Sequence, residues 1–457
     1  MLQTTNRLLP YLVAPLPLME QAVIAAYDLG YAIEVARRVA AFGDYEWGFR
    51  PAGSRAAARC AAYLEGEMRR IGLQGVEVLE FLLDGWSFEG ASVTAWTEAG
   101  ESVTLPAVAY GGACGTESDG LTGELVDCGT GAAADYEGKA VQGKIVLIEM
   151  DFGVVNWAAQ VLLEAHHQGA AGVICWPKGD YAQTPGAIHT HDLQAWAPIP
   201  MLNVNHDEGQ RLRGMRRARL WSSARNLPGA TGRNIVGYLR GTERPEEIVI
   251  IGDHYDAWFH GFLDDAVGVG GVLSLAKAMV DAGYQPKRTI AFVLHDAEEY
   301  GKLDSPWDWC TGAWAMRELK PDWAGRSVGA LIYELAGCKE SPYFELYTSP
   351  ESVGLVEAVR SQVDLRAYPE GVVIQGQPTC WADGFSYSAG LGIPSIGNLE
   401  TNPAVKSQYY HTRFDTEELL DPERYATTLL FFALLALRLD GAPLPLVDLG
   451  ATAQALA

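Results

Sequence analysis

The sequence is poor in several kinds of residue, and each scarcity excludes a class of protein. Lys and Arg number 34 against 57 Asp and Glu, a formal net charge of −23 that argues against nucleic acid or an anionic membrane as partner. The seven cysteines are scattered and form no Cys-x-x-Cys pair, so we expect reduced thiols. No apolar run is long enough for a membrane helix, and the closest, Tyr425–Leu437, predicts a buried core helix.

The first residues also lack the features of a targeting signal. The stretch MLQTTNRLLPYLVAPLPLMEQ is interrupted by prolines and has no clear small-residue cleavage site, which predicts no signal peptide. Together with reduced thiols, this favours a cytoplasmic protein. The 457 residues, 48% of them hydrophobic, are enough for two domains of ordinary globular composition.

Two adjacent acids are the most informative feature that is present. Glu298 and Glu299 end the segment Ala291–Tyr300 (AFVLHDAEEY), whose apolar beginning predicts a buried strand. Adjacent ionised carboxylates at the end of a buried strand need a cation or a proton. We therefore looked for metal ligands elsewhere in the chain.

Candidate ligands follow a second predicted strand. His254 and Asp256 come directly after the apolar start of Ile248–Asp265 and would share one face of that strand. Asp264 follows ten residues after His254, and His411 lies far downstream. One His and one carboxylate per metal, with a third carboxylate shared, can hold two zinc ions roughly 3.5–4 Å apart.

The order and spacing of these motifs resemble the co-catalytic zinc aminopeptidase family that includes glutamate carboxypeptidase II and the transferrin receptor. Asn234–Gly241 (NIVGYLRG) fits the same pattern. The resemblance implies two zinc ions per chain and a water activated between them. It implies a cis peptide bond between Asp264 and Asp265. The roles it implies are zinc ligands at His254, Glu299 and His411, a bridging ligand at Asp264, a general base at Glu298 and an orienting catalytic acid at Asp256.

Two positions depart from the family pattern. Glu334 stands where the family has Asp as the fourth carboxylate, one methylene longer but still able to bind zinc. An insertion at Lys302–Cys310 would place Trp307 and Trp309 near the mouth of the active site. The resemblance also implies that Tyr410 lies beside the site, where it could contact the tetrahedral intermediate.

The predicted fold class is α/β: a mixed, mostly parallel sheet with helices on both faces, and an inserted β-rich protease-associated domain. Leu18–Phe42 and Ser54–Ile71 have helical periodicity, with Ser54 as N-cap and Gly72 as C-terminal stop of the second. Alternating apolar runs and helical segments after Arg233 favour the sheet. The segments GKIVLI, GAAGVI and IPMLNV resemble the protease-associated domain. We expect a peptidase domain at 1–85 and 230–445, the inserted domain at 86–229 and a tail at 446–457.

The expected activity is zinc-dependent hydrolysis of an amide bond in a peptide, of the aminopeptidase or carboxypeptidase type. Three alternatives stay open: an N-acyl amino acid amidohydrolase, a glutaminyl cyclase-type acyltransferase, and a non-catalytic binding protein like the transferrin receptor. A homo-oligomer, where one forms, would use a surface other than the family's C-terminal helical domain. His189-Thr190-His191 has ligand-like spacing but is expected in a solvent-exposed loop of the inserted domain.

Overall fold

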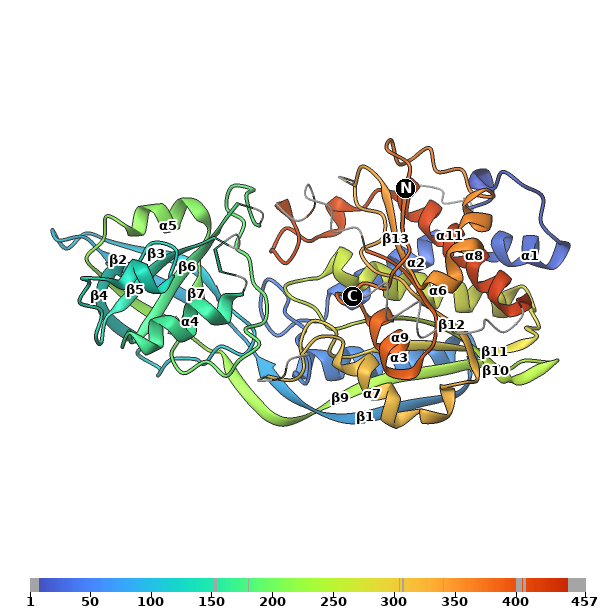
Figure 1. Ribbon diagram of the computed structural model, residues 1–457, viewed down its shortest axis with the longest axis horizontal. Helices are drawn as coiled ribbons and strands as arrows, with labels where there is room; N and C mark the ends of the chain where they lie inside the picture. The colour runs from blue at the N-terminus through green and yellow to red at the C-terminus, as the bar shows by residue number, and fades with distance from the viewer. Residues whose placement is uncertain are drawn as a thin grey trace.

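The computed structural model consists of two lobes side by side, one built around an open sheet and one around a small barrel (Figure 1). It describes residues 8–442 except 152, 153, 156, 180, 304, 306, 307, 340, 400–404, 406 and 407. The predicted tail at 446–457 and Trp307 therefore lie outside the described residues.

The larger lobe contains an eight-stranded mixed sheet. Its four central strands are parallel, whereas β1, β9 and β13 introduce antiparallel pairs. All eight residues of β11 are buried, as expected for a strand covered on both faces. In spatial order the strands are β1 (Gln74–Ser87), β9 (Arg225–Leu239), β11 (Arg288–His295), β10 (Arg244–His254), β12 (Ser327–Ile332), β15 (Ser395–Asn398), β13 (Phe344–Thr348) and β14 (Val372–Gln375).

Helices cover both faces of this sheet, and each face has its own core, as the sequence predicts. The larger core includes side chains of α1 (Leu18–Ala26), α2 (Leu29–Ala40), α3 (Arg55–Ile71), α6 (Val267–Asp281), α8 (Val353–Arg360) and α11 (Pro422–Gly441). The smaller core on the opposite face includes side chains of α7 (Thr311–Leu319) and α9 (Asp383–Leu391).

Local signals explain where several helices begin and end. Ser54 accepts a hydrogen bond from the Ala57 amide at the start of α3, and Gly72 ends that helix with a φ of 99°, as predicted. The single helical stretch expected over Leu18–Phe42 is wrong in detail. It is two helices, because Asp28 starts α2 by accepting from the Tyr31 amide. α11 is the predicted buried helix, and no helix among the described residues has the length and apolarity to cross a membrane.

The smaller lobe is a closed seven-stranded barrel with its own core. It contains parallel pairs among β4 to β7 and antiparallel pairs around β2, β3 and β8. Its elements are β2 (Ala91–Trp96), β3 (Ser102–Ala109), β4 (Leu121–Asp127), β5 (Ile145–Asp151), α4 (Ala158–His167), β6 (Gly172–Lys178), β7 (Met201–Asn203), α5 (His206–Leu212) and β8 (Arg217–Ser222).

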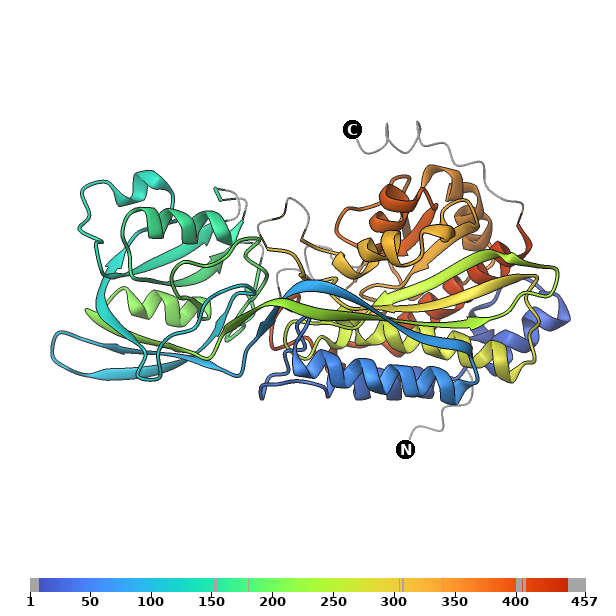
Figure 2. The ribbon, with the colours of Figure 1, turned by 90° about the horizontal axis from the view of Figure 1, so that it is seen from below.

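The two long strands β1 and β9 connect the lobes. They pair antiparallel from Gln74 with Tyr238 to Ser87 with Arg225, and Figure 2 shows them running together from the large sheet to the barrel. The predicted domain boundaries at 85/86 and 229/230 fall inside these strands and remain a prediction.

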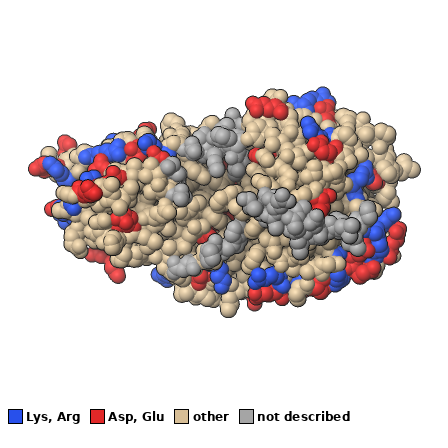
Figure 3. Space-filling model, in the orientation of Figure 1, with Lys and Arg blue, Asp and Glu red and all other residues tan. Residues whose placement is uncertain are grey.

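Charged side chains are intermixed on the surface. On the face drawn in Figure 3, Lys and Arg alternate with Asp and Glu around the edges of both lobes, and the middle of the molecule is largely free of either.

Candidate metal centre

The candidate ligands meet at the carboxyl ends of the central parallel strands. His254 is the last residue of β10, the Glu298-Glu299 pair follows β11, and Glu334 follows β12. Since β11, β10 and β12 are neighbours in this order, the chain delivers these side chains to one edge of the sheet, where α/β folds commonly bind ligands. Asp264 and His411 join them from loops, and the six side chains are between 1% and 6% exposed.

Asp264 lies between the two histidines. One carboxylate oxygen, Oδ1, is 3.4 Å from Nε2 of His254, and the other, Oδ2, is 3.2 Å from Nε2 of His411. The His411 Nε2 atom is also 3.0 Å from Oε2 of Glu299. Asp264 thus presents one oxygen to each histidine, which is the arrangement a bridging ligand requires.

Backbone groups hold these side chains in place. The Nδ1–H group of His254 donates to the carbonyl oxygen of Asp256 at 3.1 Å, which leaves Nε2 as the free ligand atom. The carboxylate of Asp256 accepts hydrogen bonds from the amides of Glu298 at 2.9 Å and Glu299 at 3.2 Å. The Asp256 side chain therefore orients the acid pair by binding the main-chain amides of Glu298 and Glu299, not by contacting their carboxylates.

Asp415 has a similar role for the bridging acid, and the sequence reasoning missed it. Its carboxylate accepts from the amides of Leu263 at 2.7 Å and Asp264 at 3.1 Å. Burial is the main cause that raises the pKa of Asp415, to about 7. The Asp264–Asp265 peptide bond is cis, as the resemblance implies.

Three non-glycine residues with left-handed backbone occur at the ligands themselves. Ala297, just before the acid pair, has a φ of 62°, Leu335, just after Glu334, has 51°, and His411 has 53°. Such conformations are uncommon for these residue types and concentrate at functional sites, where the surrounding structure maintains them.

The electrostatics of Asp264 and His411 are those of an ion pair. Burial alone would raise the pKa of Asp264, but the close approach of the His254 and His411 rings outweighs it and holds that pKa below its usual range. Burial disfavours the imidazolium of His411, yet the charges of Glu299 and Asp264 raise its pKa to about 10.

The remaining acids favour the protonated state unless a cation is close. Burial is the main cause that raises the pKa of Glu298 and Glu334 well above the ordinary value, and repulsion between the two adds to it. Burial likewise raises the pKa of Glu299 to about 7. In this cluster, protons held by carboxylates and histidines offset the negative charge of the buried acids. Bound cations would offset the same charge in place of those protons.

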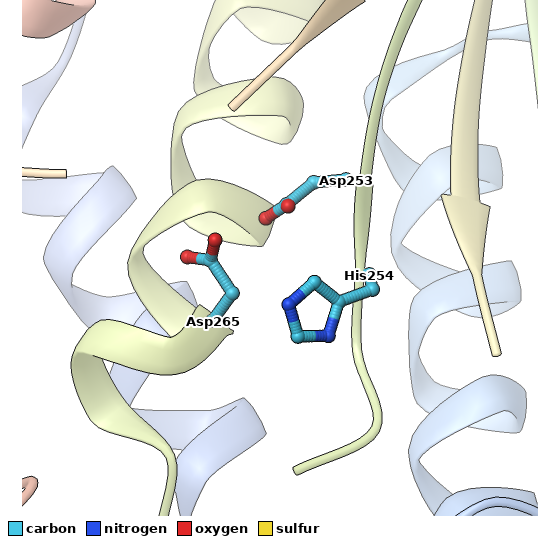
Figure 4. Close-up of side chains that lie close together, drawn as sticks. All are labelled: Asp253, His254 and Asp265. Atoms are coloured by element: carbon cyan, nitrogen blue, oxygen red, sulfur yellow. The ribbon is translucent and has the colours of Figure 1, made fainter. Parts of the chain in front are cut away.

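A further pair of acids lies behind His254. Asp253 from β10 and Asp265 from the turn before α6 turn their carboxyl groups toward each other, with the His254 ring beside them (Figure 4). Asp265 accepts from the amides of Gly268 at 2.8 Å and Leu335 at 2.9 Å. Burial, and then the charge of Asp265, raise the pKa of Asp253 well above its ordinary value, so this pair favours a protonated Asp253.

The cluster fits a metal in its chemistry. Among the described residues, five buried ligand atoms have no hydrogen-bond partner: Nε2 of His254, Oδ2 of Asp264, Oε1 of Glu299, Oε2 of Glu334 and Nε2 of His411. Ligand atoms of Asp264, Glu299 and His411 all lie within 4.8 Å of one another. Buried polar atoms without partners are costly, and imidazole with carboxylate is an ordinary zinc donor set.

The inserted barrel lies against this site. His189 and Thr190 are fully buried, so the expectation of a solvent-exposed loop is wrong for these two residues. The Thr190 amide donates to the His411 carbonyl at 3.0 Å, and His189 forms a β-bridge with Thr412. The His191 ring lies 4.8 Å from the His411 ring, in an edge-on arrangement. The alternating His-Thr-His pattern was the available signal, but its pairing with residues 411 and 412 of the other lobe depends on the tertiary structure.

Aromatic rings surround the ligands. Trp309, 9% exposed, packs edge-on against Trp157 of the barrel at 4.8 Å and against Trp381 at 5.0 Å. Its ring is 5.7 Å from that of His191. Tyr410 stacks on His411 at 3.7 Å. These rings form an aromatic wall next to the metal ligands, made by both lobes.

The insertion after the acid pair supplies two further buried groups. The Cys310 thiol donates to Oε1 of Glu298 at 3.3 Å, and its amide donates to the Glu298 carbonyl at 2.8 Å. The Asp308 carboxyl interacts with Asp192 of the barrel, and its Oδ1 accepts from Nε2 of Gln194 at 3.0 Å. Neither contact was predicted, because both depend on how the insertion folds back.

An α/β sheet with a buried cluster of histidines and carboxylates at its carboxyl edge defines a class of metal-binding α/β proteins. The sequence pattern of peptidase family M28 matches residues 234–435, which include all five candidate ligands and the candidate base, and that of the PA domain matches residues 121–212. Residues 234–435 are therefore similar to peptidase family M28, and residues 121–212 of the barrel are similar to the PA domain.

Individual relatives agree with this assignment. The chain is 39% identical over 77 residues to a glutamate carboxypeptidase 2 homolog of Caenorhabditis elegans, covering 16% of this chain and 10% of the relative. It is 24% identical over 381 residues to transferrin receptor protein 2 of Homo sapiens, covering 66% of this chain and 46% of the relative. The matches thus span a tenth to just under half the length of these two relatives.

A solved structure shows the same fold over nearly the whole chain. The zinc aminopeptidase BSAP of Bacillus subtilis superimposes with a TM-score of 0.69 at 21% identity, covering 90% of this chain and 95% of that one. The shared fold includes both lobes at this coverage.

Proposed function

We propose that this protein is a zinc-dependent exopeptidase that hydrolyses an amide bond of a short peptide. The observation that supports it most is the position of Asp264 between His254 and His411, with one oxygen toward each. His254, Asp264 and Glu334 would hold one zinc ion, and Asp264, Glu299 and His411 a second. When bound, the zinc ions supply a water of lowered pKa and polarise the scissile carbonyl.

In this proposal Glu298 moves the proton. Its carboxylate takes a proton from the attacking water and gives it to the leaving amine nitrogen. Two contacts fix its position: the amide of Glu298 on Asp256, and the Cys310 thiol on Oε1. Burial, which raises the pKa of Glu298, favours a base that takes up the proton readily, while nearby zinc would lower that pKa and ease release of the proton to the leaving amine.

The surroundings of the cluster support sequestration of the reaction from water. The His191 ring lies against His411, the Trp309 ring lies against His191, and the barrel backbone pairs with residues 411 and 412. A water-poor site strengthens every charge interaction within it. Tyr410 lies against His411, where its hydroxyl could donate to the oxygen that becomes negative during the reaction.

The transferrin receptor relative gives a second candidate, a binding protein without catalysis. We rank it lower because all five candidate ligands and the candidate base are present and buried together. The deciding experiment is Glu298→Gln, measured for zinc content and for turnover of a dipeptide and N-acyl amino acid panel. We expect full zinc content and a loss of turnover of about 10⁴-fold or more.

The matched control for that experiment is Glu318→Gln, the same change at a side chain that is 80% exposed on α7. It should leave both measurements unchanged. Wild-type turnover by Glu298→Gln would refute the assignment of the base. Absence of turnover in the zinc-loaded wild type on every substrate of the panel would favour the binding protein.

A further inference from the structure

A small cavity lies in the barrel lobe beside the metal centre, and no role has been assigned to it above. Its volume is about 90 Å³. Trp157, Tyr181, His189 and His191 form its walls, together with Tyr110 and Ala158. Two much larger surface hollows, of about 880 Å³ and about 900 Å³, contain none of the candidate ligands in their linings, so size alone does not locate a substrate subsite here.

The cavity is directly next to the ligands of the proposed second zinc ion. The His191 and His189 rings that line it are 4.8 Å and 6.1 Å from the His411 ring. Tyr181, another lining residue, is 6.5 Å from Tyr410. When the scissile carbonyl of a substrate lies at the metal centre, the substrate side chain next to that bond is therefore close enough to enter this cavity.

The lining selects against charged side chains. Its walls are aromatic and imidazole rings, and the described lining contains no Lys or Arg that could pair with an acidic side chain. The one acid, Asp192, is already occupied: Nδ1 of His191 lies 2.5 Å from Oδ1, and the Gln194 amide donates to Oδ2 at 3.1 Å. A charged group in the cavity would lose its hydration without gaining a partner.

The volume selects among uncharged side chains. An engineered cavity of roughly 150 Å³ in another protein is large enough to bind benzene. At about 90 Å³ this cavity suits a branched aliphatic group, not a phenyl or indole ring.

We propose that this cavity is a specificity pocket for a branched aliphatic side chain, such as that of leucine or valine, in the residue next to the scissile bond. The proposal rests on the proposed peptidase function and specifies its substrate class. It places the specificity of the reaction in the barrel lobe. Peptides with Glu, Lys or an aromatic ring at this position are then poor substrates.

The test compares dipeptides that differ only in one residue next to the scissile bond: Leu, Gly, Glu, Lys and Phe, varied in turn on each side of the bond. We expect kcat/KM for Leu to exceed that for Gly by about 10- to 100-fold on one side, the range usual for a small apolar group in a fitted pocket. Preference for Glu, Lys or Phe on both sides would overturn the proposal.

Variants locate the preference. Ala158→Leu at the start of α4 fills the cavity and should bring the Leu/Gly ratio close to one while hydrolysis of the Gly substrate persists. Gln160→Leu adds the same side chain to an exposed position two residues further on α4 and is the matched control. Trp157→Ala has the opposite effect: it enlarges the cavity and should raise kcat/KM for the Phe dipeptide relative to the Leu dipeptide. An unchanged Leu/Gly ratio in both Ala158→Leu and Trp157→Ala would refute the assignment.

A binding measurement separates this proposal from the peptidase assignment. Free leucine and free glycine are titrated into the zinc-loaded protein and into its Ala158→Leu variant by calorimetry. Tighter binding of leucine by the wild type alone supports the pocket even if no peptide is cleaved, in which case only the peptidase assignment fails. Equal binding of both amino acids, alongside measurable peptide turnover without a Leu preference, leaves the peptidase assignment standing and overturns the pocket.

Discussion

Replacing Asp308 with Asn should change how the stability of the protein depends on pH. Asp308 is fully buried between the two lobes, where its carboxyl interacts with Asp192. Burial, and then Asp192, raise the pKa of Asp308 to about 10, and burial raises that of Asp192 to about 6. Between these values the native pair keeps one proton, shared across the interface.

The magnitude follows from the difference between native and unfolded chains. In the unfolded chain both acids are ionised above their ordinary pKa of about 4, so the native state binds the extra proton. A raised pKa contributes stability that is complete below the unfolded value and is lost as pH rises through the native one. The wild type should therefore lose up to about 1.4 kcal/mol of unfolding free energy per pH unit from this pair between about pH 6 and about pH 10.

Asn at position 308 can donate a hydrogen bond to Asp192 as the protonated acid does, and it cannot ionise. The variant should thus be less sensitive to alkaline pH, by about 3 kcal/mol over two pH units. The assay is urea unfolding of the zinc-loaded protein and variant across this range, with fluorescence detection. Asp281→Asn, the same change at an acid that pairs with Lys277 on α6, is the control and should follow the wild type. Parallel pH profiles for wild type and Asp308→Asn would refute the shared proton.

Three further predictions concern the metal centre. Glu299→Ala and His411→Ala should each lower zinc content by elemental analysis, whereas His206→Ala, at a histidine outside the cluster, should not; full zinc in the first two would exclude them as ligands. Cys310→Ala should lower kcat about tenfold without changing zinc content or KM, because the substitution leaves a buried oxygen of Glu298 without a hydrogen-bond donor. Cys310→Ser should restore kcat. A changed zinc content in Cys310→Ala would indicate a structural role instead. Chelation should lower the midpoint of thermal unfolding, and added zinc should restore it by an amount equivalent to about 4 kcal/mol at a thousandfold excess over Kd; an unchanged midpoint would show that the cluster does not bind the ion.

Much of the large lobe follows from local sequence. The apolar run before His254 and the one before Glu298 are strands β10 and β11, and Ser54 and Gly72 bound α3 as their residue types predict. The break in Leu18–Phe42 was missed because the apolar periodicity continues across Asp28. The new helix begins there only because the Asp28 side chain accepts a hydrogen bond from the Tyr31 amide. Helical periodicity shows which face is buried but not where a polar side chain captures the backbone.

The candidate ligands were predicted by a different route. Their identity came from the order of motifs, whereas their convergence depends on β11, β10 and β12 being neighbours, which periodicity does not specify. Asp415 and Cys310 were missed because their partners, the Asp264 amide and Oε1 of Glu298, are distant or lie across an insertion. No spacing rule predicts such contacts.

The sequence by itself predicted the chemistry proposed for this protein, namely the side chains that would bind a metal and the acid that would move a proton, and it predicted which runs become strands. It could do so because residue type fixes donor atoms, and backbone period fixes which side chains share a face. Only the tertiary structure decided which barrel residues meet the site, with the Thr190 amide bonded to the His411 carbonyl and the cavity of Trp157 and Tyr181 beside it. Those contacts join segments more than two hundred residues apart, and their pairing is set by how two separately folded cores dock, not by any local preference.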